Sequence, residues 1–151
     1  MCRAHATVRS LLGALVGSVE ELTVADMEAG LEHLSRGTAR HADAILAVVE
    51  PYFKSLETGR KVYEGARELG IPHVYVVANK VRTPEEHDAI TAFCRRHRLQ
   101  LLGTIPYDEA FAAADREGRA PIDVAPQARG IAEIAALAGR LLDVSGNGGG
   151  R

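Results

Sequence analysis

Residues 44–51 read Ala-Ile-Leu-Ala-Val-Val-Glu-Pro, an apolar run that ends on a charged residue and a proline. Strands without polar alternation are typical of parallel sheets whose two faces are both covered by helices. Two further runs of this kind, 73–78 and 99–105, follow along the chain. Because parallel neighbours need a crossover between them, these runs predict a parallel sheet with helices in the connections.

The connecting segments carry helical signals. Apolar residues recur at helical spacing from Ser55 to Leu69, and Gly70 follows as a stop signal. Thr83-Pro-Glu-Glu86 is a capping box with proline at the first helical position, which predicts a helix to about His97. Outside this central part we expect helices at 4–17, 109–117 and 127–142, and a short strand at 22–27. Strand and helix alternate, so the predicted fold class is α/β.

Composition restricts the class of protein. The chain has 151 residues, 46% hydrophobic and 25% charged, which is enough for one domain with a sizeable core. The net charge of −2 gives no basic bias toward nucleic acid, and no apolar run is long enough to span a bilayer. Only two cysteines occur, which fits a reducing compartment. We predict a cytoplasmic protein with one domain over 1–143, a disordered glycine-rich tail over 144–151, and no membrane or nucleic-acid partner.

In parallel α/β sheets, ligands bind at the carboxyl ends of the strands. Asp26 ends the first expected strand, and a carboxylate there can hold a water on Mg²⁺. Gly30 follows in the next loop, where a backbone N–H can approach a terminal phosphate. An aspartate that merely caps a turn explains the same pattern equally well.

Two later loops predict a pocket for a base. Asn79 and Lys80 end one strand; the carboxamide both donates and accepts, and the lysine stem can cover a flat ring. Pro106-Tyr107-Asp108 follows the next strand at the same edge. Either loop alone is more often an ordinary connection, but two at successive strand ends are more specific.

Several stretches carry a family resemblance. They are Asp-Met-Glu-Ala-Gly-Leu-Glu-His-Leu-Ser-Arg-Gly-Thr at 26–38, Val-Val-Glu-Pro at 48–51 with Ser55 after it, Val-Ala-Asn-Lys at 77–80 and Ile-Pro-Tyr-Asp at 105–108. Together they resemble the MinD/ParA-type deviant P-loop ATPases, and within that group the CooC-type ATPases, which support nickel insertion into carbon monoxide dehydrogenase. The stretch 28–33 is the most specific match. The resemblance covers roughly residues 1–143, the C-terminal part of the family's domain.

The resemblance implies ATP and Mg²⁺ as cofactors, a homodimer, and a nickel-enzyme client such as carbon monoxide dehydrogenase. Asp26 would hold the Mg²⁺ water and Gly30 would sense the γ-phosphate. Asn79 would contact adenine, with Lys80, Pro106 and Tyr107 beside it. Glu28, His33 and Arg36 would belong to the switch that couples nucleotide state to dimer geometry, although salt bridges or helix caps explain those three as well.

Cys2 resembles the second cysteine of a Cys-X-Cys pair that binds metal across the family's dimer interface. One thiolate per subunit supplies two ligands, and His5 can add another, giving a set suited to Zn²⁺ or Ni²⁺. An inert terminal thiol is the plainer interpretation. Cys94 lies on the inner side of a helix and is expected to be a small core residue.

The sequence departs from the family in one respect: it contains no Gly-x-x-x-x-Gly-Lys-Ser/Thr loop. We therefore expect a three-layer, mostly parallel P-loop NTPase-like sheet without its first strand, P-loop and first helix. An exposed sheet edge and apolar face should result. A truncated or misassigned gene, a separate chain that supplies the rest, and a degenerate protein all fit. For the chain alone we expect weak ATP binding and no hydrolysis.

Three functions are compatible with these features. The leading hypothesis is an ATPase-family domain that acts as a nucleotide-switched dimer in metallocentre assembly. The alternative is a non-catalytic dimerisation or interaction module. A phosphoacceptor signalling domain, with Asp26, Ser55 and Lys80 in the active roles, ranks last because it requires an acidic pair after an earlier strand.

Overall fold

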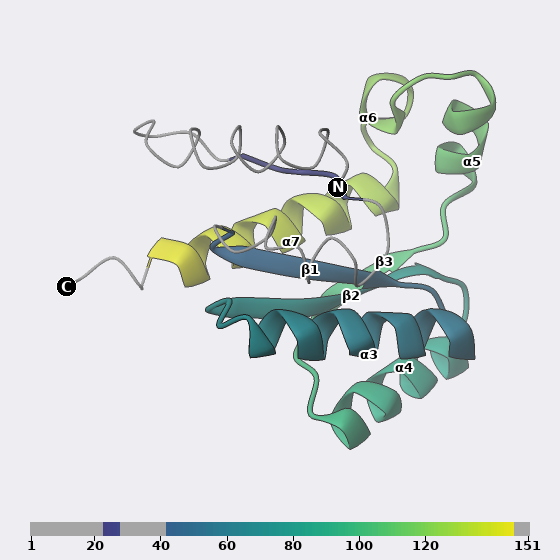
Figure 1. Cartoon of the computed structure of the whole chain (residues 1–151). Coiled ribbons are helices and arrows are strands. Elements are labelled where there is room, and N and C mark those ends of the chain that lie inside the picture. The colour runs from purple at the N-terminus through teal and green to yellow at the C-terminus, as the bar shows by residue number, and fades with distance from the viewer. Residues whose placement is uncertain (1–22, 28–41, 147–151) are drawn as a thin grey trace, which may run out of the picture.

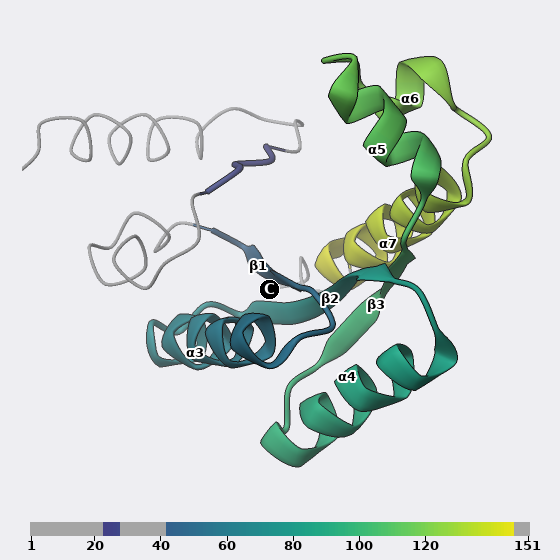
Figure 2. The same ribbon diagram turned by 90° about the vertical axis from the view of Figure 1, so that its right-hand side faces the viewer.

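The structure is a computed structural model that describes residues 23–27 and 42–146. In these residues three parallel strands form one sheet in the order β1 (Ala44–Val49), β2 (His73–Val81), β3 (Leu101–Pro106). Two helices, α3 (Phe53–Glu68) and α4 (Pro84–His97), lie on one face, and α7 (Arg129–Gly146) lies on the other (Figures 1 and 2). The predicted α/β class with a three-layer arrangement is confirmed.

Local chemistry sets the bounds of α4. The Thr83 hydroxyl accepts the N–H of Glu86 at 3.2 Å, which confirms the predicted cap. The Glu86 carboxylate accepts the N–H of Arg82 at 2.6 Å, so both side chains of the box satisfy helix-start donors. The helix ends at Arg98, whose φ of 57° is the left-handed conformation that commonly ends helices.

Several bounds differ from the predictions. β2 continues through Asn79 and Lys80 to Val81 instead of ending at Ala78. α7 begins at Arg129 and continues past Leu142 to Gly146. The short helix α6 (Pro121–Val124), which packs against α5 (Glu109–Arg116), was not predicted. The expected helix at 4–17 and residues 147–151 lie outside the described part of the chain.

The predicted strand at 22–27 is wrong for the residues that can be compared. Residues 23–27 have no regular structure, and Val24 is 83% exposed. In both views this purple segment lies apart from the sheet (Figures 1 and 2). A strand is held by its ladder to a neighbour. None of the described strands lies beside 23–27, so an apolar sequence alone does not make it one.

The core lies between the sheet and the two helices α3 and α4. Its members are buried side chains from both layers: Val49, Tyr63, Ala66, Ile71, Val74, Val76, Ala78, Val81, Ile90, Cys94 and Leu99. Cys94 is therefore a core residue, as predicted, and burial raises the pKa of its thiol. Among the helices of the described ranges, none has the length and hydrophobicity needed to cross a membrane.

β1 is buried on one face only. Ala47 and Val49 face α3 and are 5% and 1% exposed, whereas Leu46 and Val48 on the other face are 41% and 57% exposed. The prediction that this strand is covered on both faces is wrong for the described residues, because α7 covers β3 instead. β1 is also an edge of the described sheet, which agrees with the exposed edge and apolar face expected where the family's first strand is absent.

Gly59 is the point where α3 approaches β1 most closely. A methyl group at Gly59 would collide with Cγ1 of the buried Val49. We expect overpacking in Gly59→Ala to lower the free energy of unfolding by about 1–3 kcal/mol. The higher helix propensity of alanine offsets roughly 1 kcal/mol of this loss. Gly139→Ala, where nothing lies within 4 Å of the added methyl, should instead stabilise by about 0.5–1 kcal/mol. Urea unfolding of both variants checks this, and equal shifts in the same direction would contradict the close contact.

Candidate functional site

The three strands are parallel, so the carboxyl ends of β1, β2 and β3 lie at the same edge of the sheet (Figure 1). Polar residues follow or end each strand there. Glu50 follows β1, and Tyr107 follows β3. Asn79 and Lys80 lie near the carboxyl end of β2. The sequence predicted that Asn79, Lys80, Pro106 and Tyr107 lie at the same edge of the sheet, and the structure places all four there. It does not test what they bind.

Asn79 and Lys80 form an irregularity in the β2–β3 ladder. The register shifts between Ala78 and Val81, so these two residues bulge out of the pairing. Lys80 has a φ of 56°, a left-handed conformation that costs a non-glycine residue about 1–3 kcal/mol. The backbone N–H of Lys80 donates to Oδ1 of Asn79 at 3.0 Å, which fixes the orientation of the carboxamide.

An ion pair joins the ends of β1 and β2. Nζ of Lys80 lies 2.8 Å from Oε1 of Glu50, and this carboxylate raises the pKa of Lys80. The backbone N–H of Glu50 donates to Oγ of Ser55 at 2.9 Å, so the segment after β1 is tied to the start of α3. Glu50 belongs to the 48–51 stretch that carries the family resemblance, but the sequence alone indicated no role for its side chain.

The loop after β3 is held against β2 by a backbone hydrogen bond and by a cation–π contact. The N–H of Tyr107 donates to the carbonyl of Val81 at 2.9 Å, which continues the ladder past Pro106. The guanidinium of Arg82 lies 3.4 Å from the centroid of the Tyr107 ring, a cation–π contact. The Tyr107 hydroxyl donates to Oε2 of Glu109 at 2.9 Å.

Asp108 has a structural role within this loop. Its Oδ1 accepts the N–H of Ala110 at 3.0 Å and caps α5. Its Oδ2 accepts the N–H of Gly130 at 3.1 Å, at the start of α7. Both oxygens of the carboxylate are thus engaged with the backbone, which favours an anchoring role over direct ligand contact.

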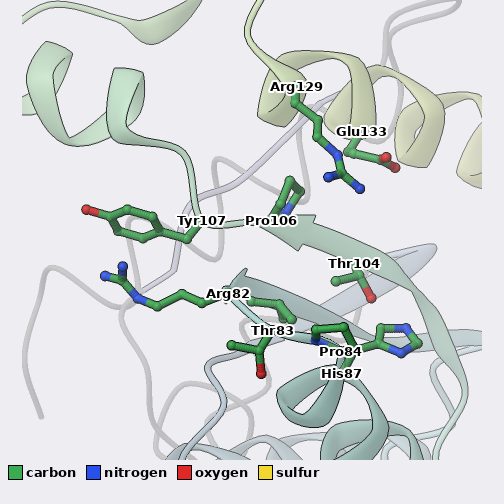
Figure 3. A pocket seen from close by; sticks show the side chains of 10 residues that line it. Arg82, Thr83, Pro84, His87, Thr104, Pro106, Tyr107, Arg129 and Glu133 are labelled. Atoms are coloured by element: carbon green, nitrogen blue, oxygen red, sulfur yellow. The ribbon is translucent and has the colours of Figure 1, made fainter.

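A hollow of about 470 Å³ opens beside the Pro106–Tyr107 loop (Figure 3). Arg82, Thr83 and His87 line it from the α4 side, and Arg129 and Glu133 line it from α7. Figure 3 shows Arg82 and Tyr107 at one end and Thr104 and His87 at the other. Asn79 and Lys80 are not among its lining residues, so the predicted pair of loops does not enclose a single described pocket.

The remaining predicted site residues precede β1 in the chain. Asp26 is exposed and lies in the irregular segment 23–27. Gly30, Cys2, His5, Glu28, His33 and Arg36 lie outside the described residues. Within the described ranges, no group of three or more His, Cys, Asp or Glu side chains is arranged to hold a metal ion. The magnesium, phosphate and interface-metal assignments therefore stay predictions.

Comparison with known proteins supports the resemblance seen in the sequence. No protein-family model matches the chain. The carbon monoxide dehydrogenase accessory protein CooC of Rhodospirillum rubrum is 38% identical over 143 residues, which cover 95% of this chain and 53% of CooC. An uncharacterised ATP-binding protein of Methanocaldococcus jannaschii is 36% identical over 124 residues, 82% of this chain and 48% of that protein. The chain thus spans about half the length of the curated relatives it matches.

Solved structures show the same fold. The cell division ATPase MinD of Pyrococcus furiosus superposes with a TM-score of 0.76 over 93% of this chain and 59% of MinD, at 19% identity. A ParA family ATPase of Chlorobium tepidum gives a TM-score of 0.71 over 91% of this chain and 56% of its own, at 20% identity. The chain is therefore related in sequence to CooC and to ATP-binding proteins, and it has the MinD/ParA fold.

Proposed function

We propose that this relative of CooC and of the MinD/ParA-type ATPases forms the base-binding part of an ATP-binding domain that works in metallocentre assembly. The observation that carries the proposal is the 38% identity to CooC, which extends over 95% of the chain. A match of that extent includes every strand end described above. The polar groups at those ends supply a physical reason for nucleotide binding.

The described residues suit the base end of ATP. Oδ1 of Asn79 is held by the Lys80 N–H, which leaves the NH₂ group to donate and one lone pair to accept. That pattern complements the N6 amino group and ring nitrogens of adenine. Pro106 and Tyr107 lie at the neighbouring strand end, where they can pack against the ring.

The phosphate end of ATP has no such cradle in this sequence, because the Gly-x-x-x-x-Gly-Lys-Ser/Thr pattern is absent. Bound Mg²⁺ would neutralise phosphate charge, and Asp26 would hold one of its waters, with Gly30 near the γ-phosphate. The whole domain would hydrolyse ATP as a homodimer that delivers nickel to a client such as carbon monoxide dehydrogenase. Cys2 would bind Zn²⁺ or Ni²⁺ at the dimer interface. The cytoplasmic location belongs to the same proposal.

Calorimetric titration with Mg-ATP and Mg-ADP tests the proposal on the chain and on a version extended in frame at its N-terminus. We expect a dissociation constant weaker than about 10 μM and no turnover for the chain, and much tighter binding for the extended version. In the version that binds, Asn79→Ala should weaken ATP binding about tenfold. Gln100→Ala removes an exposed amide elsewhere and should change nothing. Nanomolar binding by the chain alone, or an unaffected Asn79→Ala variant, would contradict this function.

The exposed apolar face of β1 favours a second candidate, a non-catalytic interaction module. Leu46 and Val48 are exposed next to a strand edge, a combination typical of surfaces that pair with another chain. If neither the chain nor its extended version binds nucleotide, the interaction module becomes the favoured function. Sedimentation of the chain and of a Leu46→Ser, Val48→Ser variant then measures whether the face mediates association.

A further inference from the structure

We infer that Glu50 is a positioning residue for base recognition, because its ion pair with Lys80 holds the β2 bulge that orients the Asn79 carboxamide. The inference rests on the proposed nucleotide function for its purpose. The structural part of it concerns the chain itself and can be tested without any ligand.

The first step is the unusual backbone of Lys80. Two described residues other than glycine have positive φ, Arg98 at 57° and Lys80 at 56°. Arg98 is the C-cap of α4, where the left-handed conformation is common. Lys80 lies at a bulge inside β2, where glycine is the residue that usually adopts the left-handed conformation. Strained residues of this kind persist only when their surroundings hold them, and they cluster at functional sites.

The second step is the set of contacts that hold Lys80. Its side chain spans from β2 to the end of β1, where Nζ meets Oε1 of Glu50 at 2.8 Å. Glu50 is itself fixed, since its N–H donates to Oγ of Ser55. The pair joins two elements that are 30 residues apart in sequence. The ion pair fixes the far end of the Lys80 side chain, which limits the movement of the bulge. The lysine stem then lies along the carboxyl edge of the sheet.

The third step is the effect on Asn79. The N–H of Lys80 donates to Oδ1 of Asn79 at 3.0 Å, and this bond decides which way the amide faces, so a displacement of the bulge that moves the Lys80 N–H also turns the carboxamide. A fixed amide presents its NH₂ to acceptors and one oxygen lone pair to a donor. Adenine offers such a donor and acceptor side by side, whereas the O6 and N7 of guanine are both acceptors. Glu50 thereby contributes to base selectivity without touching the base.

The first experiment uses ¹⁵N-labelled chain without nucleotide. Glu50→Gln should shift the Asn79 side-chain NH₂ and Lys80 amide signals and speed exchange of the Lys80 amide about two- to fivefold, the range expected for losing one exposed ion pair. Glu57→Gln breaks a comparable pair on α3, with Arg60 at 3.0 Å, and should leave these signals unchanged. The charge swap Glu50→Lys with Lys80→Glu should restore the position of the Asn79 side-chain NH₂ signals. Signals in Glu50→Gln that match those in Glu57→Gln would overturn the inference.

The second experiment measures Mg-ATP and Mg-GTP binding by the version of the protein that binds nucleotide. Glu50→Gln should weaken Mg-ATP binding about two- to fivefold and Mg-GTP binding less. The ratio of the Mg-GTP to the Mg-ATP dissociation constant should therefore fall. Glu57→Gln should change neither. If ATP binds and Glu50→Gln keeps the full preference, the inference fails while the proposed function stands. If no version binds nucleotide but the amide signals respond as expected, the proposed function fails and the positioning role of Glu50 stands.

Discussion

We expect Ile90→Ala to lower the free energy of unfolding by about 2–5 kcal/mol. Ile90 is 0% exposed and lies in the cluster that joins α4 to the sheet. Truncation removes buried methyl and methylene groups and leaves a cavity beside Cys94 and the strands. The surrounding structure relaxes only partly around such a cavity, so the loss exceeds the transfer free energy of the removed groups.

A matched substitution controls for the intrinsic preference of alanine. Ile122→Ala makes the same chemical change on α6, where the side chain is 60% exposed, and should alter stability by less than about 0.5–1 kcal/mol. Urea unfolding followed by circular dichroism gives both values, and the midpoint of Ile90→Ala should fall without a change in slope. Similar effects for the two variants would mean that α4 does not pack on the sheet.

The sequence predicted α4 well because the signals for this helix are local. Thr83, Pro84 and Glu86 act within one turn, and the start of α4 follows from them. The strand at 22–27 failed because a strand depends on a neighbour that composition does not reveal. The same limit applies to β1, whose apolar residues are equally hydrophobic on both faces although only Ala47 and Val49 are buried.

Site prediction had a similar limit. Asn79 and Tyr107 were found because parallel strands send their following residues to one edge. Glu50 was missed because its importance depends on Lys80, 30 residues further on, and on β1 and β2 being neighbours. The useful signal was the abrupt change from Val49 to a carboxylate at a strand end. A charge in that position can be checked against the end of each neighbouring strand once the order is known.

Asp108→Ala should destabilise the protein by about 2–4 kcal/mol, the second large effect we expect. The change removes the cap of α5 and also leaves the N–H of Gly130 without an acceptor. Gly130 is buried, and its Cα faces the ring of Phe111, so water has little access to the freed group. Hydrogen exchange at the Ala110 and Gly130 amides should accelerate together, because one side chain protects both.

Two further variants separate the anchoring role of Asp108 from a contact with the base. Asp108→Asn keeps one acceptor oxygen but turns an NH₂ toward the other N–H, so its loss of stability should fall between wild type and Asp108→Ala. Asp115→Ala removes an exposed carboxylate from α5 and should stay within about 0.5 kcal/mol of wild type. An anchoring residue changes stability in this graded order whether or not nucleotide is present. If Asp108→Ala instead kept full stability and lost only ATP affinity, both carboxylate hydrogen bonds would be dispensable, and Asp108 would belong to the base pocket with Asn79 and Tyr107.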